Sequence, residues 1–481
     1  MTKLNGWRIG AVFAYCALTG IGAPAQTLTT VVNFDRRNGS WPYKASLSQA
    51  TDGNLYGATE TGGANDRGTI FRLTPSGNHT VVHSFNFTDG ASPLGTPVQG
   101  IDGSLYGTTD TGGATGCEDN GCGTVFKLTP SGKLITLHQF CLQNQCPDGL
   151  YPEAGLVQAT DGNFYGTTAY GGAYGAGTVF RITPGGVLTT IYSFCAGGNP
   201  CVDGSLPFAG LTQASDGGLY GTTAFGGTYG EGTIFKISLE GTLTVVYTFC
   251  SQPNCGDGAE PFGGVVEAAD GKFYGTTAGG GTGGYGTVFR VTFGGKLTTL
   301  SSFDSMSGTG PTGGLIQGTD SLFYGTTVGG GTSNYGTVFS MTPTGTLTVL
   351  HNFAGYPTDG AYSYSSLLQA TTGSFYGVTY SGGDERKCRD GCGTVFNLDM
   401  GLSAFVALVR NPSKIGQGFG ILGQGLAGST AVELNGTPAN FTVVSDTFIK
   451  ATVPSGATTG YVTVTTPTGV LTSNVPFHVI Q

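Results

Sequence analysis

The chain has 481 residues and a formal net charge of −9, and only 10% of its residues are charged, so it lacks a basic stripe that would neutralise nucleic-acid phosphates. Its 88 Gly and 21 Pro residues are accompanied by 11% aromatic residues at recurring positions, which excludes a disordered low-complexity polymer. The length allows about two to four domains.

The first 25 residues are typical of a secretory signal peptide. Lys3 and Arg8 precede the apolar stretch Ile9–Ile21, and Ala23–Ala25 supplies the small-x-small pattern of a cleavage site. We expect cleavage after Ala25 and an exported protein, extracellular or at the cell surface, with the periplasm as the alternative. No later apolar run is long enough to span a bilayer.

Residues 26–400 contain one unit seven times. A Tyr-Gly anchor recurs every 50 to 59 residues, a period typical of solenoids, propellers and arrays. The anchor tyrosines are Tyr56, Tyr106, Tyr165, Tyr220, Tyr274, Tyr324 and Tyr376.

In the third copy the unit has four strand-like runs, at Gly155–Ala159, Asn163–Thr168, Gly177–Thr183 and Val187–Phe194. Asp-Gly and Pro-Gly-Gly between runs favour tight turns, because Gly adopts positive φ at little steric cost. The runs alternate poorly, as do strands in sheets that are buried on both faces. Four antiparallel strands repeated seven times predict an all-β, seven-bladed β-propeller over residues 26–400. A β-solenoid is the alternative, but its repeats are shorter.

The connections differ in how much their lengths vary. In six copies the Gly of Gly-Thr-Val/Ile-Phe lies 17 residues before the Phe that ends the fourth strand. Variation is confined to the loop between the second and third strands and to the connection between units. These connections emerge on one face of an up-and-down blade, and recognition is commonly placed on variable loops, so we expect binding on that face.

The units, such as Asp161–Gly172 (DGNFYGTTAYGG) and Gly177–Gly186 (GTVFRITPGG), resemble the GloVer tandem repeats of exported bacterial proteins. The resemblance covers Gln26–Met400, and the Tyr-Gly-x-Thr and Gly-Thr-Val/Ile-Phe motifs occur in all seven copies. It implies an exported, surface-associated bacterial protein, and it brings no catalytic motif.

The first strand of the mature chain matches the last strand of the unit. Leu28–Phe34 (LTTVVNF) is similar to the fourth strands of other copies, whereas the seventh copy runs out after Gly393–Leu398. We predict that Leu28–Phe34 supplies the last strand of the seventh blade and closes the propeller, which removes an exposed sheet edge. The alternative strand, Ala404–Val409, also matches the opening strand of the next domain.

Residues 403–481 lack the anchors and predict a β-sandwich, because short alternating strands are separated by turns at Asn435-Gly436 and Pro454–Gly456. The segment resembles an IPT/TIG domain, an immunoglobulin-like module, and this resemblance implies a spacer or interaction role. The matching pieces are Phe405–Leu408, Gly423–Leu426, Leu434–Gly436 and Ala451–Pro454.

Ten cysteines follow the signal peptide in five close pairs. Local pairs in an exported chain predict disulfides, and we expect these bonds to stiffen the variable loops more than they hold the fold. Zinc is the alternative, but the pairs are scattered among the units and have no nearby His, so we expect no metal and no other cofactor. The pairs are Cys117/Cys122, Cys141/Cys146, Cys195/Cys201, Cys250/Cys255 and Cys388/Cys392.

Several recurring polar residues have both a structural and a functional interpretation. A Gln in the first strand of six copies, replaced by Glu267 in the fifth, suits a polar channel mouth, but we favour hydrogen bonds to a neighbouring blade. Glu60 and Asp110 follow Tyr-Gly-x-Thr in the first two copies and are weak candidates for a catalytic carboxylate pair. The Asp-Gly sequences in the connections favour turns over Ca²⁺ binding. The histidines lie on or beside fourth strands, which does not suit a catalytic base.

Aromatic residues in the variable loops carry the binding hypothesis, because their rings can stack on sugars, with packing of the Gly-rich loops as the alternative. We therefore expect a secreted or cell-surface binding or adhesion protein that recognises a carbohydrate or a surface polymer. The alternatives are a secreted polysaccharide-acting hydrolase or lyase and a structural cell-surface protein. The candidate binding residues are Trp41, Tyr151, Tyr170, Tyr174, Phe225, Tyr229, Tyr285, Tyr335 and Glu267.

Overall fold

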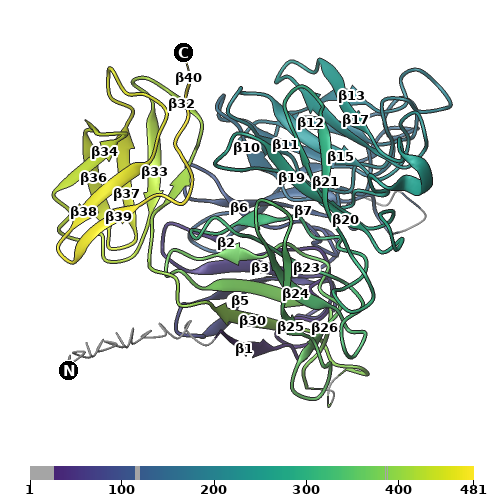
Figure 1. Cartoon of the computed structure of the whole chain (residues 1–481), viewed down its shortest axis with the longest axis horizontal. Coiled ribbons are helices and arrows are strands. Elements are labelled where there is room, and N and C mark those ends of the chain that lie inside the picture. The colour runs from purple at the N-terminus through teal and green to yellow at the C-terminus, as the bar shows by residue number, and fades with distance from the viewer. Residues whose placement is uncertain (1–25, 114–116, 118–119, 385, 387, 481) are drawn as a thin grey trace, which may run out of the picture.

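The computed structural model describes residues 26–113, 117, 120–384, 386 and 388–480, so the predicted signal peptide lies outside the described residues. Within these residues the repeats form seven four-stranded antiparallel sheets, and the C-terminal segment forms two more (Figure 1). None of the helices in this part of the chain is long and apolar enough to cross a membrane.

Six of the sheets each use four strands that are consecutive in sequence. Sheet I contains β2 (Ser48–Gln49), β3 (Leu55–Thr59), β4 (Thr69–Leu73) and β5 (His79–Ser84); sheet II β6 (Val98–Gln99), β7 (Leu105–Thr109), β8 (Thr124–Leu128) and β9 (Leu134–Gln139); sheet III β10 (Val157–Gln158), β11 (Phe164–Thr168), β12 (Thr178–Ile182) and β13 (Leu188–Ser193); sheet IV β14 (Thr212–Gln213), β15 (Leu219–Thr223), β16 (Thr233–Ile237) and β17 (Leu243–Thr248); sheet V β18 (Val266–Glu267), β19 (Phe273–Thr277), β20 (Thr287–Val291) and β21 (Leu297–Ser302); sheet VI β22 (Ile316–Gln317), β23 (Phe323–Thr326), β24 (Thr337–Met341) and β25 (Leu347–Asn352). A short 3-10 helix, η1 (Pro253–Cys255), lies between sheets IV and V.

Sheet VII joins the two ends of the repeat segment. It contains β27 (Leu368–Gln369), β28 (Phe375–Thr379), β30 (Thr394–Asp399) and β1 (Thr27–Asn33). Strand β1 pairs antiparallel with β30, with Leu28 opposite Leu398. This is the pairing predicted for the N-terminal strand.

The repeated motifs are explained by packing. Gly166 follows the anchor Tyr165 and lies opposite Phe180, and a Cβ on Gly166 would approach Phe180 Cζ to 2.6 Å. Only glycine leaves room for that ring. The hydroxyl of Tyr165 donates to Asp161 in the preceding turn at 2.9 Å. The Gly–Phe pairing recurs in all seven sheets, at Gly57/Phe71, Gly107/Phe126, Gly166/Phe180, Gly221/Phe235, Gly275/Phe289, Gly325/Phe339 and Gly377/Phe396.

Amide side chains on the first strands join neighbouring sheets. Gln213 accepts a hydrogen bond from the backbone N–H of Thr160 in sheet III at 3.0 Å and donates to Gly217 O at 3.1 Å. In the fifth copy both carboxylate oxygens of Glu267 accept from Ser215, at 2.7 Å from its N and 2.5 Å from its Oγ. Sheet I is joined to sheet VII in the same way, because Gln49 accepts from Thr371 N at 3.0 Å. The interpretation of these residues as links between blades fits these contacts. The glutamines are Gln49, Gln99, Gln158, Gln213, Gln317 and Gln369.

The apolar cores also lie between sheets. One core combines Val32 and Val395 of sheet VII with Leu55 and Phe71 of sheet I. Comparable cores lie between the sheets of every other neighbouring pair. The arrangement is therefore β-propeller-like, with each sheet buried on both faces.

The C-terminal segment folds as two packed sheets. The first contains β31 (Ala407–Val409), β33 (Gly418–Leu422), β37 (Phe448–Thr452) and β36 (Phe441–Ser445), and the second β35 (Thr437–Pro438), β34 (Ala431–Leu434), β38 (Val462–Thr466) and β39 (Gly469–Thr472). A parallel pair, β32 (Ser413–Lys414) and β40 (Val479–Ile480), lies beside them. The two sheets share a core that includes Ile421, Ile449 and Val462. We call this unit the sandwich.

Candidate functional site

The two variable connections of each sheet lie together at one end. In sheet III a bridge joins Leu150 in the incoming connection to Tyr170 in the loop after the second strand, and Ser205 pairs with Phe225 in sheet IV. In sheet VII the same contact is the short ladder of β26 (Gly360–Ala361) and β29 (Ser381–Gly382). We call this end the loop face, and the opposite end, with the tight turns between first and second strands, the turn face.

Disulfides fasten the loop face. All five predicted pairs are bonded, which confirms the disulfide prediction: Cys117–Cys122, Cys141–Cys146, Cys195–Cys201, Cys250–Cys255 and Cys388–Cys392.

The disulfide between Cys388 and Cys392 closes a short loop and also lies in an apolar core. Both residues are buried, Cys392 with none of its surface exposed, and both belong to the apolar core that sheets VII and I share. The carbonyl oxygen of Cys392 also accepts a hydrogen bond from Trp41 N, in the connection to sheet I, at 2.8 Å. The sulfurs of this pair therefore also fill the core where the two ends of the repeat segment meet.

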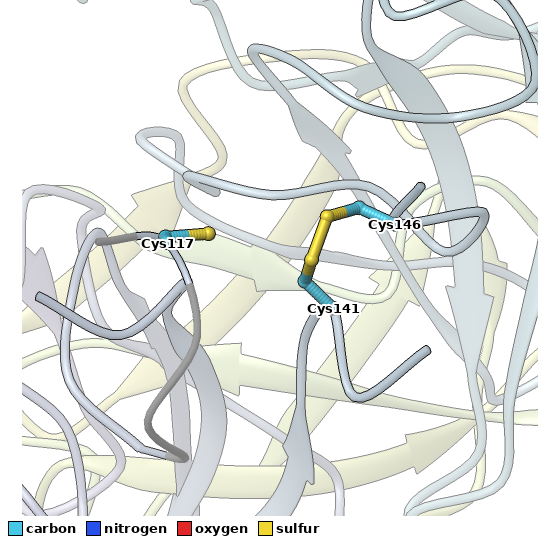
Figure 2. Close-up of side chains that lie close together, drawn as sticks. All are labelled: Cys117, Cys141 and Cys146. Atoms are coloured by element: carbon cyan, nitrogen blue, oxygen red, sulfur yellow. A yellow bond between two sulfur atoms is a disulfide. The ribbon is translucent and has the colours of Figure 1, made fainter. Parts of the chain in front are cut away.

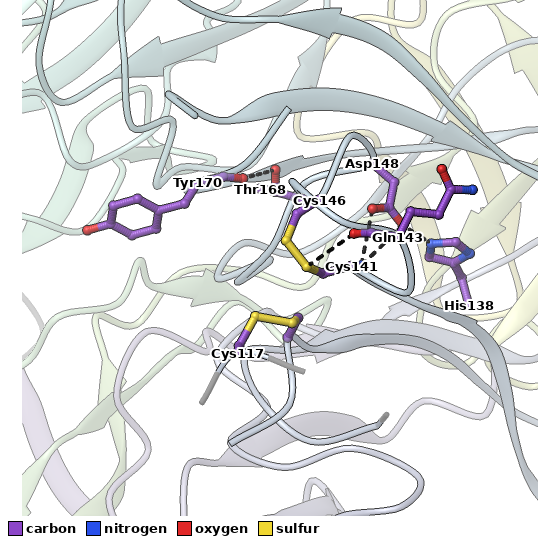
Figure 3. Close-up of a disulfide and its surroundings, with 9 residues drawn as sticks. Cys117, His138, Cys141, Gln143, Cys146, Asp148, Thr168 and Tyr170 are labelled. Carbon is purple, nitrogen blue, oxygen red and sulfur yellow. Dashed lines mark hydrogen bonds and ion pairs between the residues drawn. A yellow bond between two sulfur atoms is a disulfide. The ribbon is translucent and has the colours of Figure 1, made fainter. Parts of the chain in front are cut away.

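The aspartates of the connections also hold the loop face. In Figure 3 the Cys141–Cys146 bond lies beside Asp148, which pairs with His138 Nε2 at 2.8 Å and accepts from Cys141 N at 3.1 Å. This contact between a fourth-strand side chain and the aspartate recurs in other sheets and keeps the connections in place. The residues that make the same contact with the aspartate of their own connection are His83, Tyr192, Tyr247 and His351.

Two disulfides approach each other between sheets II and III. The Sγ atoms of Cys117, Cys141 and Cys146 all lie within 4.8 Å of one another (Figure 2). Each of the three sulfurs is already bonded, Cys117 to Cys122 and Cys141 to Cys146. A metal would need them as free thiolates, so the cluster is a contact between disulfides.

A cavity of about 500 Å³ opens where the inner strands begin at the loop face. One residue from every sheet lines it, always at the position that follows the Pro of the incoming connection or, in the seventh copy, Ser363. We call this set the mouth column. Its members are Tyr43, Leu94, Glu153, Phe208, Phe262, Thr312 and Tyr364.

Lys44 crosses this mouth. Its Nζ lies 2.5 Å from Glu153 Oε2 in the connection to sheet III and 4.5 Å from the ring centroid of Phe208 in the connection to sheet IV. The ion pair is mostly shielded from solvent, because the two side chains are 22% and 16% exposed. A residue of the first copy thus contacts the third and fourth copies at one point.

Two groups of aromatic rings line the mouth. The rings of Tyr43 and Tyr364 lie 4.7 Å apart, and Tyr380 lies 5.9 Å from Tyr364. Beside Lys44, Phe208 lies 5.7 Å from Phe262. All these side chains except Tyr380 line the cavity itself, so they offer ring surface to a bound molecule.

Three acidic residues interact near the mouth, and of these Glu153 lines the cavity itself. Burial, reinforced by the negative charges of Glu153 and Glu60 and opposed by Lys44, raises the pKa of Asp110 to about 7. Asp110 Oδ1 is buried and has no hydrogen-bond partner among the described residues. Burial and Glu153 also raise the pKa of Glu60, so the two candidate carboxylates belong to one electrostatic cluster with Glu153.

The tyrosine beside these acids is affected in the same direction. Burial, then the neighbouring Tyr364, Glu153 and Glu60, raise the pKa of Tyr43 to about 12. Its hydroxyl therefore stays protonated near neutral pH and can donate a hydrogen bond to a ligand.

The predicted binding residues are distributed over three places. Trp41 and Phe225 lie at the edge of the mouth. The ring centroid of Trp41 is 6.2 Å from that of Tyr380, and the ring centroid of Phe225 is 6.2 Å from that of Phe262. Tyr174 and Tyr229 are 56% and 54% exposed in loops of the loop face, outside the cavity lining. Glu267 lies in the link to Ser215 at the turn face.

The other predicted tyrosines pair within the loop face. Tyr151 and Tyr170 meet at 6.1 Å, and Tyr335 meets Tyr362 at 5.5 Å. Tyr285 is exposed. These rings form an outer rim around the mouth.

None of the mouth-column residues, nor Lys44, was predicted from the sequence. The available signal was the position after the connection Pro, where the copies differ although the flanking residues are similar. These seven positions all line one cavity, so the differences between the copies make the lining of that cavity asymmetric.

Solved structures similar to this chain are distant. A gluconolactonase from Xanthomonas campestris is 12% identical with a TM-score of 0.41, over 78% of this chain and 89% of that one. A protein of unknown function from Bacteroides thetaiotaomicron is 14% identical with a TM-score of 0.39, over 78% and 76%. A puromycin hydrolase is 12% identical with a TM-score of 0.42, over 71% and 50%. No curated protein matches the chain.

The repeats themselves identify the family. The model of the Gloeobacter/Verrucomicrobia repeat matches residues 8–214 and again residues 198–396, which together cover most of the chain. The chain therefore belongs to the Gloeobacter/Verrucomicrobia repeat family.

Proposed function

We propose that this protein binds a carbohydrate at the loop-face mouth. The observation that carries the proposal is a single cavity lined by aromatic rings from four sheets and by the Lys44–Glu153 ion pair. Aromatic rings such as Phe208 and Tyr364 stack on the C–H faces of sugars. The carboxylate of Glu153, which lines the cavity, can accept hydrogen bonds from sugar hydroxyls. A few polar groups converging in a largely apolar pocket are typical of small-molecule sites.

The size of the site limits what enters it. A cavity of about 500 Å³ falls within the usual range for small ligands, roughly 300 to 1,000 Å³. We infer that one end or a short stretch of a glycan occupies the mouth. A longer surface polymer would continue over the exposed rings of Tyr170, Tyr174 and Tyr229 on the same face.

We further infer that the seven sheets are the blades of a closed seven-bladed propeller. Three observations support closure: β1 pairs with β30, Gln49 links to Thr371, and sheets VII and I share an apolar core. A closed ring makes the mouth a fixed site, because each column residue is held by a blade on either side.

The setting we propose is outside the cell. Five disulfides are typical of an oxidising compartment, which supports export by the segment 1–25. We assign the sandwich as an IPT/TIG-like module, supported by its two packed four-stranded sheets. Mass spectrometry of protein secreted by a bacterial host tests the first assignment: a mature N-terminus at Gln26 supports it, and an intact residue 1 overturns it.

A second function is favoured by one observation, the pKa of Asp110. A carboxyl with a pKa of about 7 beside other carboxyl groups can serve as the general acid of a glycosidase, which pairs it with a second carboxylate. In that function Asp110 would protonate the leaving oxygen, and Glu60 or Glu153 would act as the second carboxylate. Release of reducing sugar that is abolished by Asp110→Asn would support hydrolysis, and binding without release supports the first proposal.

The test begins with a glycan array on the wild-type protein, followed by calorimetry on the glycans that bind. We expect Phe208→Ala and Glu153→Gln each to weaken binding about tenfold, since each removes one stacking or hydrogen-bond contact. The matched control is Tyr461→Ala, an exposed ring on the sandwich. Unchanged affinity in both mouth variants, with melting temperatures preserved, would refute the mouth as the site.

A further inference from the structure

A second cavity, of about 1160 Å³, lies between the turn face and the sandwich. The two parts touch at a few points: Thr447 Oγ1 donates to Thr51 O at 2.7 Å, and Arg410 Nη2 donates to Thr160 O at 2.8 Å. Figure 1 shows the sandwich beside the part of the repeat segment that carries β2 and β6. We call the space between these contacts the chamber.

The repeat wall of the chamber offers few free polar groups. Gln99, Gln158 and Gln213 line it, but their amides are occupied by the links between sheets. Asp102 is held by Lys127 at 2.7 Å and by the hydroxyl of Tyr106 at 2.8 Å. What this wall presents to solvent is an aliphatic side chain, Ile101, which is 57% exposed.

The sandwich wall carries the free charges. Val409, Gly420, Lys450 and Thr442 are paired across four adjacent strands, so their side chains share the face that lines the chamber. The ring of Phe448 occupies the space over Gly420, where a Cβ would meet it at 2.7 Å. Lys450 is exposed, and no interaction of its side chain is found in the part of the chain that the structure describes.

Arg410, the residue after Val409, adds a second cation next to this row of paired residues. One of its nitrogens reaches Thr160, but its Nε is buried without a hydrogen-bond partner among the described residues. A buried guanidinium N–H that is left unpaired costs free energy, and an anion would satisfy it. Arg410 directly follows β31, and β31 and the strand of Lys450 flank β33, so these two strands are roughly 10 Å apart, which two long side chains can bridge.

Apolar side chains line both walls of the chamber. Val444 is 53% exposed on the sandwich wall, and Ile101 is exposed on the opposite wall. Both are aliphatic, and the ring of Phe448 adds aromatic surface to the sandwich wall. The chamber thus combines two unneutralised cations with branched aliphatic surface.

We infer that the chamber binds an amphiphilic anion, a molecule with one carboxylate or phosphate head and an alkyl chain. The head is held by Lys450 and by the unpaired Nε of Arg410, and the chain lies against Ile101 and Val444. This site is separate from the carbohydrate site and does not depend on it.

The test uses calorimetry on the full chain with octanoate, octyl phosphate and 1-octanol. We expect one site for the anions, weakened about tenfold by Lys450→Ala, because a charge-assisted contact is lost. Ile101→Ser should weaken the binding of both anions. Lys414→Ala, an exposed lysine on β32 outside the chamber, is the matched control and should bind as the wild type does.

Comparing octanoate with octyl phosphate identifies the preferred head group. The inference is overturned if neither anion binds, if Lys450→Ala binds both anions as tightly as the wild type, or if 1-octanol binds as tightly as they do. Phe208→Ala should leave anion binding unchanged, since that residue lies at the other end of the repeat segment.

Discussion

Replacing Asp110 with Asn should stabilise the protein by an amount that grows as pH rises from about 4 to 7 and is complete above pH 7. In the folded chain burial and the charges of Glu153 and Glu60 raise the pKa of this carboxyl from 3.8 to about 7. Below pH 3.8 the carboxyl is protonated in both the folded and the unfolded state. Between pH 3.8 and 7 only the folded state keeps the proton, so this group makes stability fall as pH rises.

The size of the effect follows from the shift. About three pKa units correspond to at most about 4 kcal/mol, at 1.36 kcal/mol per unit. Asp110 is partly exposed as a residue, so solvent screening reduces this value, and we expect about 2 to 4 kcal/mol. Asp110→Asn removes the ionised form, so the full gain appears above pH 7 and almost none remains near pH 4.

The assay is urea unfolding of wild type and variant at pH 4.5, 6 and 8, followed by circular dichroism and tyrosine fluorescence. Groups that titrate independently of Asp110 contribute equally to the free energy of unfolding of both proteins, so their contributions cancel in the difference. Glu240→Gln, at an exposed turn, is the control and should change stability by less than about 0.5 kcal/mol at each pH. A difference between Asp110→Asn and wild type that is independent of pH, or a less stable variant at pH 8, would refute the reasoning.

Three further predictions concern the fold. Gly166→Ala should lower the free energy of unfolding by about 1 to 3 kcal/mol, because its Cβ would meet Phe180 at 2.6 Å, whereas Gly185→Ala, with its nearest contact at 3.8 Å, should be close to neutral in a thermal melt. Replacing both Cys195 and Cys201 with Ser should cost about 2 kcal/mol, the loop-closure entropy of a short loop, and a much larger loss would mean that the bond shapes the whole fold. Deleting residues 26–34 should unfold the repeat segment in circular dichroism, whereas deleting residues 403–481 should leave it folded, and the reverse result would contradict closure by β1.

The repeat made the sheets predictable, because turn residues and strand length recur with every copy. The pairing of Leu28–Phe34 with sheet VII could be predicted as well, since the seventh copy lacks its own fourth strand. The disulfide pairing followed from local spacing alone, but the burial of Cys392 did not, because it depends on how sheet I packs against sheet VII. The features that were predicted depend on residues that are close in sequence or that repeat with the period.

The mouth could be predicted only in part. Lys44 and Glu153 are 109 residues apart, and their contact depends on how seven sheets are arranged around one point. Glu60 and Asp110 were found from the repeat register, but their perturbed pKa values arise from burial that spacing does not reveal. The polar residue Glu267 was placed on the correct strand, and its contact with Ser215 depends on the neighbouring turn.

The most direct test of the central claim is a crystal structure with the glycan that binds most tightly in the array. The account predicts that a sugar ring lies in the loop-face cavity, stacked on Phe208 or Tyr364 and hydrogen-bonded to Glu153. A glycan bound on the sandwich, or only on the outer tyrosines with the cavity free of sugar, would contradict it.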